Sequence, residues 1–330
     1  MKQPHEAEAK PQGKRVIAPF DFTPPVMPAM PVTKRSPLRN ILDDYIWWGS
    51  RKKCILFFTS FDITAFIAFC DRCKAEGRRP PSLPVYFARC VGIVVAHDPW
   101  IAAAKHGKGL YVPHDVNILM MVAGHTHEGE DMALFVDIPA AQNKDMAQIA
   151  AELSDRVRSL RRDCSRNSPG FQRAARFGRW PTPLRRGLYL VSSWFPHVRR
   201  SMSVHSSYFA ITSLSQAVPG RGGWSVPILP ASVSVALGGI SRRPAVVAGE
   251  IVARDFLDVT FRMDHEIGDG VPTLEVMHRL GLEVESGRLL EEYFRDPASK
   301  PRKRKPGAKT EEAGGNDGES GEREAESGSQ

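Results

Sequence analysis

The sequence contains no run of about 20 apolar residues, the length that a helix needs to cross a bilayer. Its first residues, MKQPHEAEAKPQGKR, lack the apolar core of a signal peptide. Cysteine is scarce, and its odd number and its apolar or helical surroundings argue against a disulfide framework; the five are Cys54, Cys70, Cys73, Cys90 and Cys164. Together these absences predict a cytoplasmic protein.

The sequence also lacks the motifs of a nucleotide-hydrolysing enzyme and of a metal site. No strand-like segment leads into a glycine-rich phosphate loop, which argues against nucleotide hydrolysis. Cys70 and Cys73 lack the second pair or nearby histidine that would complete a zinc site, so we interpret them as packing residues. His125 and His127 stand beside acidic residues, but a polar hairpin turn explains them better than a metal site. We therefore expect no metal.

Both ends of the chain have little material for a core. Residues 1–36 are rich in proline, and residues 297–330 form a basic cluster followed by an acidic Gly/Ser tail. Neither segment can bury enough apolar surface to offset the entropy lost on ordering, so we expect both to be disordered. The PRKRKP cluster could be a nuclear signal or a nucleic-acid patch, but a solvated tail is favoured. The globular part is then 37–296.

Within the globular part, the hydrophobic pattern alternates between strand and helix periods and predicts a mixed α/β domain. Helices are predicted at 66–77, 82–99, 144–163 and 271–296. Strands are predicted at 54–64, 109–124, 132–139, 206–215, 232–240 and 245–264, the last of these with a turn at Gly249.

One short motif carries chemistry, and it falls where the last strand meets the last helix. The segment FRMDHEIGDGVPTLEVMHRL places His265, Asp269 and Gly270 in the spacing His-x-x-x-Asp-Gly. A histidine titrates near neutrality and can remove a proton from a thiol or an alcohol. An aspartate four residues later can hold the turn, and a glycine lets the chain turn without a Cβ clash. The alternative is a satisfied histidine at the end of a strand.

The segment 227–280 resembles the catalytic domain of dihydrolipoamide acyltransferases, the acyltransferase components of 2-oxo acid dehydrogenase complexes. The resemblance lies in Asp-His-x-x-x-Asp-Gly, in Pro227 and Pro230, and in the apolar strand VSVALGG. Earlier segments, such as FDITAFIAFCDRCKAEG and GLYVPHDVNILMMVAG, follow the family's order and spacing. The resemblance covers about 37–164 and 205–290, and it implies a chloramphenicol acetyltransferase-like α/β fold, a two-layer mixed sheet with flanking helices.

The resemblance also implies a role for each matching residue. His265 would be the general base, and Asp269 would be structural, paired with Arg39 near the start of the domain. A hydroxyl in the segment AITSLS would stabilise the oxyanion; Thr212 aligns without a gap, and Ser213 aligns with a shift of one residue. The sequence departs from the family at Ser215, where the family has glycine, and at Glu266, where arginine is usual.

In the family, three subunits form a trimer with each active site between two of them, so a homotrimer is implied. The complete family proteins carry lipoyl domains, whereas this chain has only about 36 residues before its catalytic domain and no lipoate-bearing turn. The acyl donor is therefore expected to be a coenzyme A thioester or a lipoyl group on another protein. The alternative to an enzyme is a catalytically inactive trimeric scaffold or regulatory module of the same fold.

The segment 165–204 is an insertion relative to the family, and it contains eight arginines and no acidic residue. Tryptophan, phenylalanine and tyrosine are interleaved with these arginines. This pattern suits an anionic membrane surface, an acidic acyl carrier protein or the phosphates of coenzyme A, while nucleic acid has no supporting motif. The alternative is a basic helical hairpin that packs its aromatic residues on the domain or on a neighbouring subunit.

Overall fold

The computed structural model describes residues 36–106, 108–125, 131–163, 169–194, 209–215 and 220–295. The terminal segments predicted to be disordered, 1–36 and 297–330, lie outside the described residues apart from Ser36. The same holds for His127, and the side chain of His125 is not described either.

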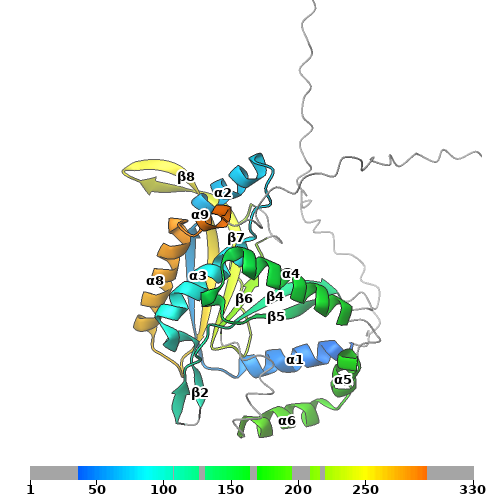
Figure 1. Ribbon diagram of the computed structural model, residues 1–330. Coiled ribbons are helices and arrows are strands. Elements are labelled where there is room, and N and C mark those ends of the chain that lie inside the picture. The colour runs from blue at the N-terminus through cyan, green and yellow to red at the C-terminus, as the bar shows by residue number, and fades with distance from the viewer. Residues whose placement is uncertain are drawn as a thin grey trace, which may run out of the picture. The chain divides into compact units, whose positions relative to one another are not determined.

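A six-stranded mixed sheet forms the centre of the fold, in the order β1-β8-β7-β6-β4-β5 (Figure 1). Strands β4 and β7 run parallel to β6, and the remaining neighbours are antiparallel. This arrangement confirms the predicted mixed α/β fold. The strands are β1 (Cys54–Asp62), β4 (Ile118–His125), β5 (Asp131–Ile138), β6 (Phe209–Ser213), β7 (Val233–Val247) and β8 (Glu250–Asp264). A separate hairpin pairs β2 (Ala104–His106) with β3 (Gly109–Tyr111).

One face of the sheet, here called the inner face, carries the main hydrophobic core. Alternate residues of β8, namely Leu257, Val259, Phe261 and Met263, are buried in it because successive side chains of a strand point to opposite faces. Four of the longer helices lie along the sheet (Figure 1) and contribute residues to the same cluster, to which Leu290 near the end of the described chain also belongs. The four helices are α2 (Thr64–Ala75), α3 (Leu83–His97), α4 (Met146–Asp163) and α8 (Gly270–Ser286). Cys70 and Cys73 belong to this core.

The opposite or outer face of the sheet carries buried polar side chains where β7 and β8 lie. The side chains of Ser234, Asp258, Thr260 and Arg262 alternate with the core residues of β7 and β8. The guanidinium of Arg262 donates to the carbonyl oxygens of Leu229 and Gly49, at 2.7 and 2.6 Å. The segment 220–232 and the helix α1 (Pro37–Ser50) therefore cover part of this face.

Two predicted elements are divided in the structure. The strand predicted at 109–124 breaks between β3 and β4, where the chain bonds to residues 140–142 instead of to a neighbouring strand, with Ala141 N donating to Val116 O at 2.8 Å. Gln142 Oε1 accepts from Val116 N, and Asn117 Oδ1 accepts from Ala140 N. The helix predicted at 271–296 ends at Gly287, whose φ of 64° is left-handed, and α9 (Leu290–Arg295) follows.

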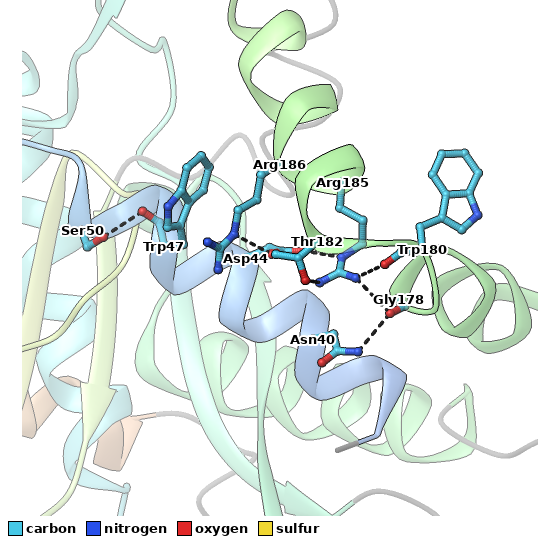
Figure 2. Close-up of polar contacts among 9 residues, drawn as sticks. All are labelled: Asn40, Asp44, Trp47, Ser50, Gly178, Trp180, Thr182, Arg185 and Arg186. Atoms are coloured by element: carbon cyan, nitrogen blue, oxygen red, sulfur yellow. Dashed lines mark hydrogen bonds and ion pairs between the residues drawn. The ribbon is translucent and has the colours of Figure 1, made fainter. Parts of the chain in front are cut away.

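The described part of the arginine-rich insertion forms a helical hairpin of α5 (Pro169–Gly178) and α6 (Thr182–Trp194). The hairpin packs on α1, as Figure 2 shows. Tyr189 of α6 places its ring 6.4 Å from that of Trp48 and 6.3 Å from that of Phe177. This packing agrees with the interpretation of the insertion as a basic hairpin resting on its own domain. No helix within the described ranges is both long and apolar enough to cross a membrane.

Candidate active site

The turn after β8 holds His265 through hydrogen bonds to two separate segments. His265 N donates to Lys53 O at 2.7 Å, and Asp264 N donates to Ser232 O at 2.9 Å. The Asp264 carboxylate, which is nearly buried, accepts from Lys52 Nζ at 2.8 Å. Lys53 precedes β1 and Ser232 precedes β7, the two neighbours of β8 in the sheet. Because both hold the backbone at 264–265, the histidine is positioned by the fold itself.

The imidazole of His265 is open to solvent, with its side chain 53% exposed. Its Nδ1 lies 3.7 Å from Oδ1 of Asp269, whose side chain is 87% exposed. This separation is too long for a hydrogen bond, so the carboxylate lies near the ring without bonding to it. The arrangement suits a base that takes up a proton and returns it.

The start of α8 shows why glycine and threonine follow the histidine. A Cβ at Gly268 would come within 2.6 Å of the Trp100 ring, so this position requires glycine. Around Gly270, by contrast, the space is open, and the close approach expected there occurs at Gly268. Asp269 occupies the N-cap position of α8 without a side-chain capping bond, and Thr273 Oγ1 donates to the Asp269 carbonyl at 2.7 Å. The Asp269 carboxylate therefore does not cap the helix, and it lies beside the His265 ring instead.

Glu266, where the family that the sequence resembles usually has arginine, forms an ion pair with a lysine. Its carboxylate accepts from Lys105 Nζ at 2.6 Å, in an exposed ion pair. Its backbone N donates to Oδ1 of Asp264 at 3.2 Å. Lys105 belongs to β2, so this contact ties the β2–β3 hairpin to the histidine turn.

The two hydroxyl candidates lie on opposite faces of β6. Thr212 shares the outer face with Ala210, and Ser213 shares the inner face with Phe209 and Ile211. Ser213 Oγ is 3.0 Å from the hydroxyl of Ser215, where the family has glycine. Ser213 is therefore engaged with its own loop.

The chain does not bring these hydroxyls to its own histidine. Thr212 stands opposite Ala236 in β7, and Ala236 stands opposite Thr260 in β8, five residues before His265. At the rise of a strand, five residues correspond to about 17 Å along the sheet. Ser213 is one residue further away, since it stands opposite Leu237 and, through it, Val259. His265 and the two candidate hydroxyls therefore lie far apart in one copy of the chain.

The ion pair expected between Arg39 and Asp269 is not among those formed by the described residues. Its Nε is 3.8 Å from Oδ1 of Asp43, one turn further along α1. The structure thus brings Asp269 to His265 and Arg39 to Asp43.

Three supporting residues were not foreseen from the sequence. Lys52 binds the carboxylate before the histidine, Lys105 binds the one after it, and Trp100 packs against Gly268. Their partners are distant in the sequence, and no local pattern marks them.

Comparison with known proteins identifies the fold through solved structures and not through the sequence. No family model matches the chain, and no curated protein matches its sequence. Among solved structures, the probable dihydrolipoamide acetyltransferase of Listeria monocytogenes has a TM-score of 0.59 at 14% identity, with 78% of this chain and 95% of that chain covered.

Two further structures match at similar levels. The cubic core of a pyruvate dehydrogenase multienzyme complex gives a TM-score of 0.57 at 17% identity, over 83% of this chain and 98% of that one. The Azotobacter vinelandii dihydrolipoamide acetyltransferase gives 0.58 at 19% identity, with the same coverage. Its structure addresses the roles of a serine, a histidine and an asparagine in catalysis. The chain therefore has the fold of the acyltransferase catalytic cores of 2-oxo acid dehydrogenase complexes, as its sequence predicted.

Proposed function

We propose that the protein is an acyltransferase that moves an acyl group from a coenzyme A or lipoyl thioester to a thiol or hydroxyl acceptor. The observation that carries the proposal is the His265 turn, where an exposed imidazole is fixed by its backbone and faces one carboxylate. The acyltransferase fold supports the same chemistry.

In the proposed reaction, Nε2 of His265 removes the proton from the acceptor thiol or hydroxyl. The resulting sulfur or oxygen attacks the thioester carbonyl, and the carbonyl electrons move onto the oxygen. When this tetrahedral intermediate collapses, the bond from carbon to the donor sulfur breaks, and the imidazolium returns its proton to the departing thiolate. Asp269 stabilises the imidazolium through its charge, at the observed 3.7 Å.

The oxyanion requires a hydrogen-bond donor, and we assign this part to Thr212 rather than Ser213. Thr212 lies on the outer face of the sheet, whereas Ser213 faces the core helices and contacts Ser215. Because Thr212 is far from His265 in the same chain, the hydroxyl must come from a second copy. A site shared with a second copy fits the homotrimer that the sequence resemblance implies, with each active site between two subunits.

An exposed apolar surface supports this assembly. On the outer side of the edge strand β1, Leu56 and Phe58 are exposed. Trp224, Val226 and Ile228 are also exposed, in the segment 220–232 that covers part of the outer face. The two groups are adjacent, because Trp224 Nε1 donates to Thr59 O at 3.2 Å. Contiguous apolar surface of this kind usually marks a protein interface.

The test is turnover of acetyl- and longer acyl-coenzyme A against a panel of thiol acceptors that includes dihydrolipoamide. We expect His265→Ala to abolish transfer while leaving the oligomeric state unchanged, and His278→Ala, on the exposed side of α8, to retain it. Binding of acyl-coenzyme A without turnover, equal in the wild type and in His265→Ala, would instead favour an inactive trimeric scaffold. Transfer that survives in His265→Ala would show that another group is the base.

A further inference from the structure

The helix α6 carries aliphatic side chains on the side that faces away from the domain. Leu184, Leu188 and Val191 are 56%, 41% and 54% exposed, and their i, i+4, i+7 spacing places them in one stripe along the helix. Gly187 lies between them, and a Cβ there would meet nothing within 4 Å. The stripe is therefore uncovered in the described part of the chain.

The opposite side of the hairpin is held firmly on α1, so this orientation is fixed by packing. The buried carboxylate of Asp44 accepts from Arg185 Nε at 2.6 Å and from Arg186 Nε at 3.2 Å (Figure 2). Gly178 closes the same contact, since its carbonyl accepts from Asn40 Nδ2 at 3.1 Å and from Arg185. The outward stripe is consequently not the face that stabilises the hairpin.

The charged residues of the hairpin itself are all of one sign. Residues 169–194 contain five arginines and no aspartate or glutamate. Asp44 binds Arg185 and Arg186, while the side chains of Arg173, Arg176 and Arg179 are exposed. Trp180, at the bend between α5 and α6, is exposed as well. Aliphatic residues, a tryptophan and arginines on a short helical hairpin are the composition of a segment that lies in the membrane interface.

We propose that the α5–α6 hairpin docks the protein on an anionic lipid bilayer. The arginines would bind the lipid phosphates, and the stripe of Leu184, Leu188 and Val191 would enter the boundary between headgroups and acyl chains. A second copy of the hairpin is a poor occupant, because it would bring the same arginines together without a compensating acid. This inference does not depend on acyl transfer.

The experiment is vesicle co-sedimentation of the full-length protein. The vesicles are pure phosphatidylcholine or equal parts phosphatidylcholine and phosphatidylglycerol, each at low and high salt. The expected result is sedimentation only with the anionic vesicles, weakening as salt rises. Absence of binding to both, or equal binding to both, would overturn the proposal.

Matched variants assign the binding to the hairpin. Leu184→Glu and Arg176→Glu should each weaken binding to anionic vesicles, with a loss of at least about fivefold for the arginine. The controls are Leu282→Glu in α8, where the leucine is 54% exposed, and Arg242→Glu in β7, and both should bind as the wild type does. All of these side chains are exposed, so circular dichroism is expected to show native folding for each variant.

Equal losses in the hairpin variants and the controls would show that the hairpin is not the docking surface. Salt-sensitive binding to a purified acidic acyl carrier protein, without any binding to vesicles, would also overturn the proposal. It would identify the hairpin as a protein-docking surface instead.

Discussion

Asp44 in α1 and Arg185 in α6 form a buried ion pair, with Oδ2 2.6 Å from Nε, although 141 residues separate them in the sequence. A buried carboxylate is tolerated only when it is paired and hydrogen-bonded. Asp44 is paired twice, because Arg186 also donates to it. The insertion and the first helix of the domain therefore depend on one another.

Replacement of Asp44 tests this dependence. Asp44→Ala leaves the buried guanidinium of Arg185 without its carboxylate, and we expect the free energy of unfolding to fall by about 3–5 kcal/mol. Urea denaturation followed by circular dichroism measures the change. Asp71→Ala is the control, since Asp71 forms an exposed pair with Lys74 that should be worth at most about 1 kcal/mol. Equal effects of the two substitutions would mean that the buried pair does not hold the hairpin.

The thiols of the core helices are expected to be unreactive. Burial, together with the neighbouring Cys73 thiol, raises the pKa of Cys70 from 9.0 to about 11. Burial also raises the pKa values of Cys73 and Cys90. At a pH well below both values, such a shift reduces the thiolate fraction of Cys70 by about a hundredfold, and the thiolate is the reactive form.

Alkylation by iodoacetamide, followed by mass spectrometry, checks this prediction. In a variant with Cys54→Ser and Cys164→Ser, the three remaining thiols should react slowly in the native protein and quickly in urea. Rapid native labelling of Cys70 and Cys73 would contradict their assignment to the core.

The sequence predicted those parts of the molecule whose pattern is local. Strands β7 and β8 were predicted because apolar residues alternate along them, and the turn at Gly249 has a positive φ of 88°. The His-x-x-x-Asp-Gly spacing located the histidine turn, and the structure places Asp269 beside His265. Periodicity and short motifs are properties of neighbouring residues, which is why they can be read from one sequence.

Contacts between distant residues were not predictable in this way. Nothing in the residues around Asp44 indicates that its carboxylate is buried. Arg185 and Arg186, which bind it, lie in the segment 165–204, which contains no acidic residue. Similarly, the requirement for glycine falls at Gly268 because the ring of Trp100 packs there. Only the folded chain brings such residues together, and the same limit applies to Arg39, which the structure pairs with Asp43.

Acid should weaken the fold through Asp62. Burial alone would raise the pKa of this carboxyl, but hydrogen bonds from Thr64 N at 2.9 Å and Arg254 Nε at 2.7 Å lower it below its ordinary 3.8. A carboxyl with a depressed folded pKa stabilises the protein above its unfolded pKa, and this stability is lost as the pH falls through the folded value.

The prediction is a pH-dependent effect of Asp62→Asn. At neutral pH the variant should unfold at a lower urea concentration than the wild type. Below about pH 4 the difference should shrink, because the wild-type carboxyl is then protonated in the unfolded chain and increasingly so in the folded one. A difference that stays constant from neutral to acidic pH would show that the charge of Asp62 is not the cause.

The separation of Thr212 from His265 leads to a prediction about mixed assemblies. If each site takes its base from one subunit and its hydroxyl from another, Thr212→Val should lower kcat by about 10²–10³ and His265→Ala should abolish transfer. Co-expression of the two variants from differently tagged genes should then restore activity. With random assembly, about a quarter of the sites would combine an intact histidine with an intact threonine.

The comparison that decides this prediction is with either variant purified alone and with a chain that carries both substitutions. The doubly substituted chain should not rescue a second copy of itself, because none of its subunits supplies either group. Recovery to about a quarter of wild-type activity in the mixed assembly would fit a site shared between subunits. Failure to recover, in an assembly that contains both tags, would mean that Thr212 does not complete the site of a neighbour. Ser213→Ala would then take the place of Thr212→Val in the same pairing with His265→Ala.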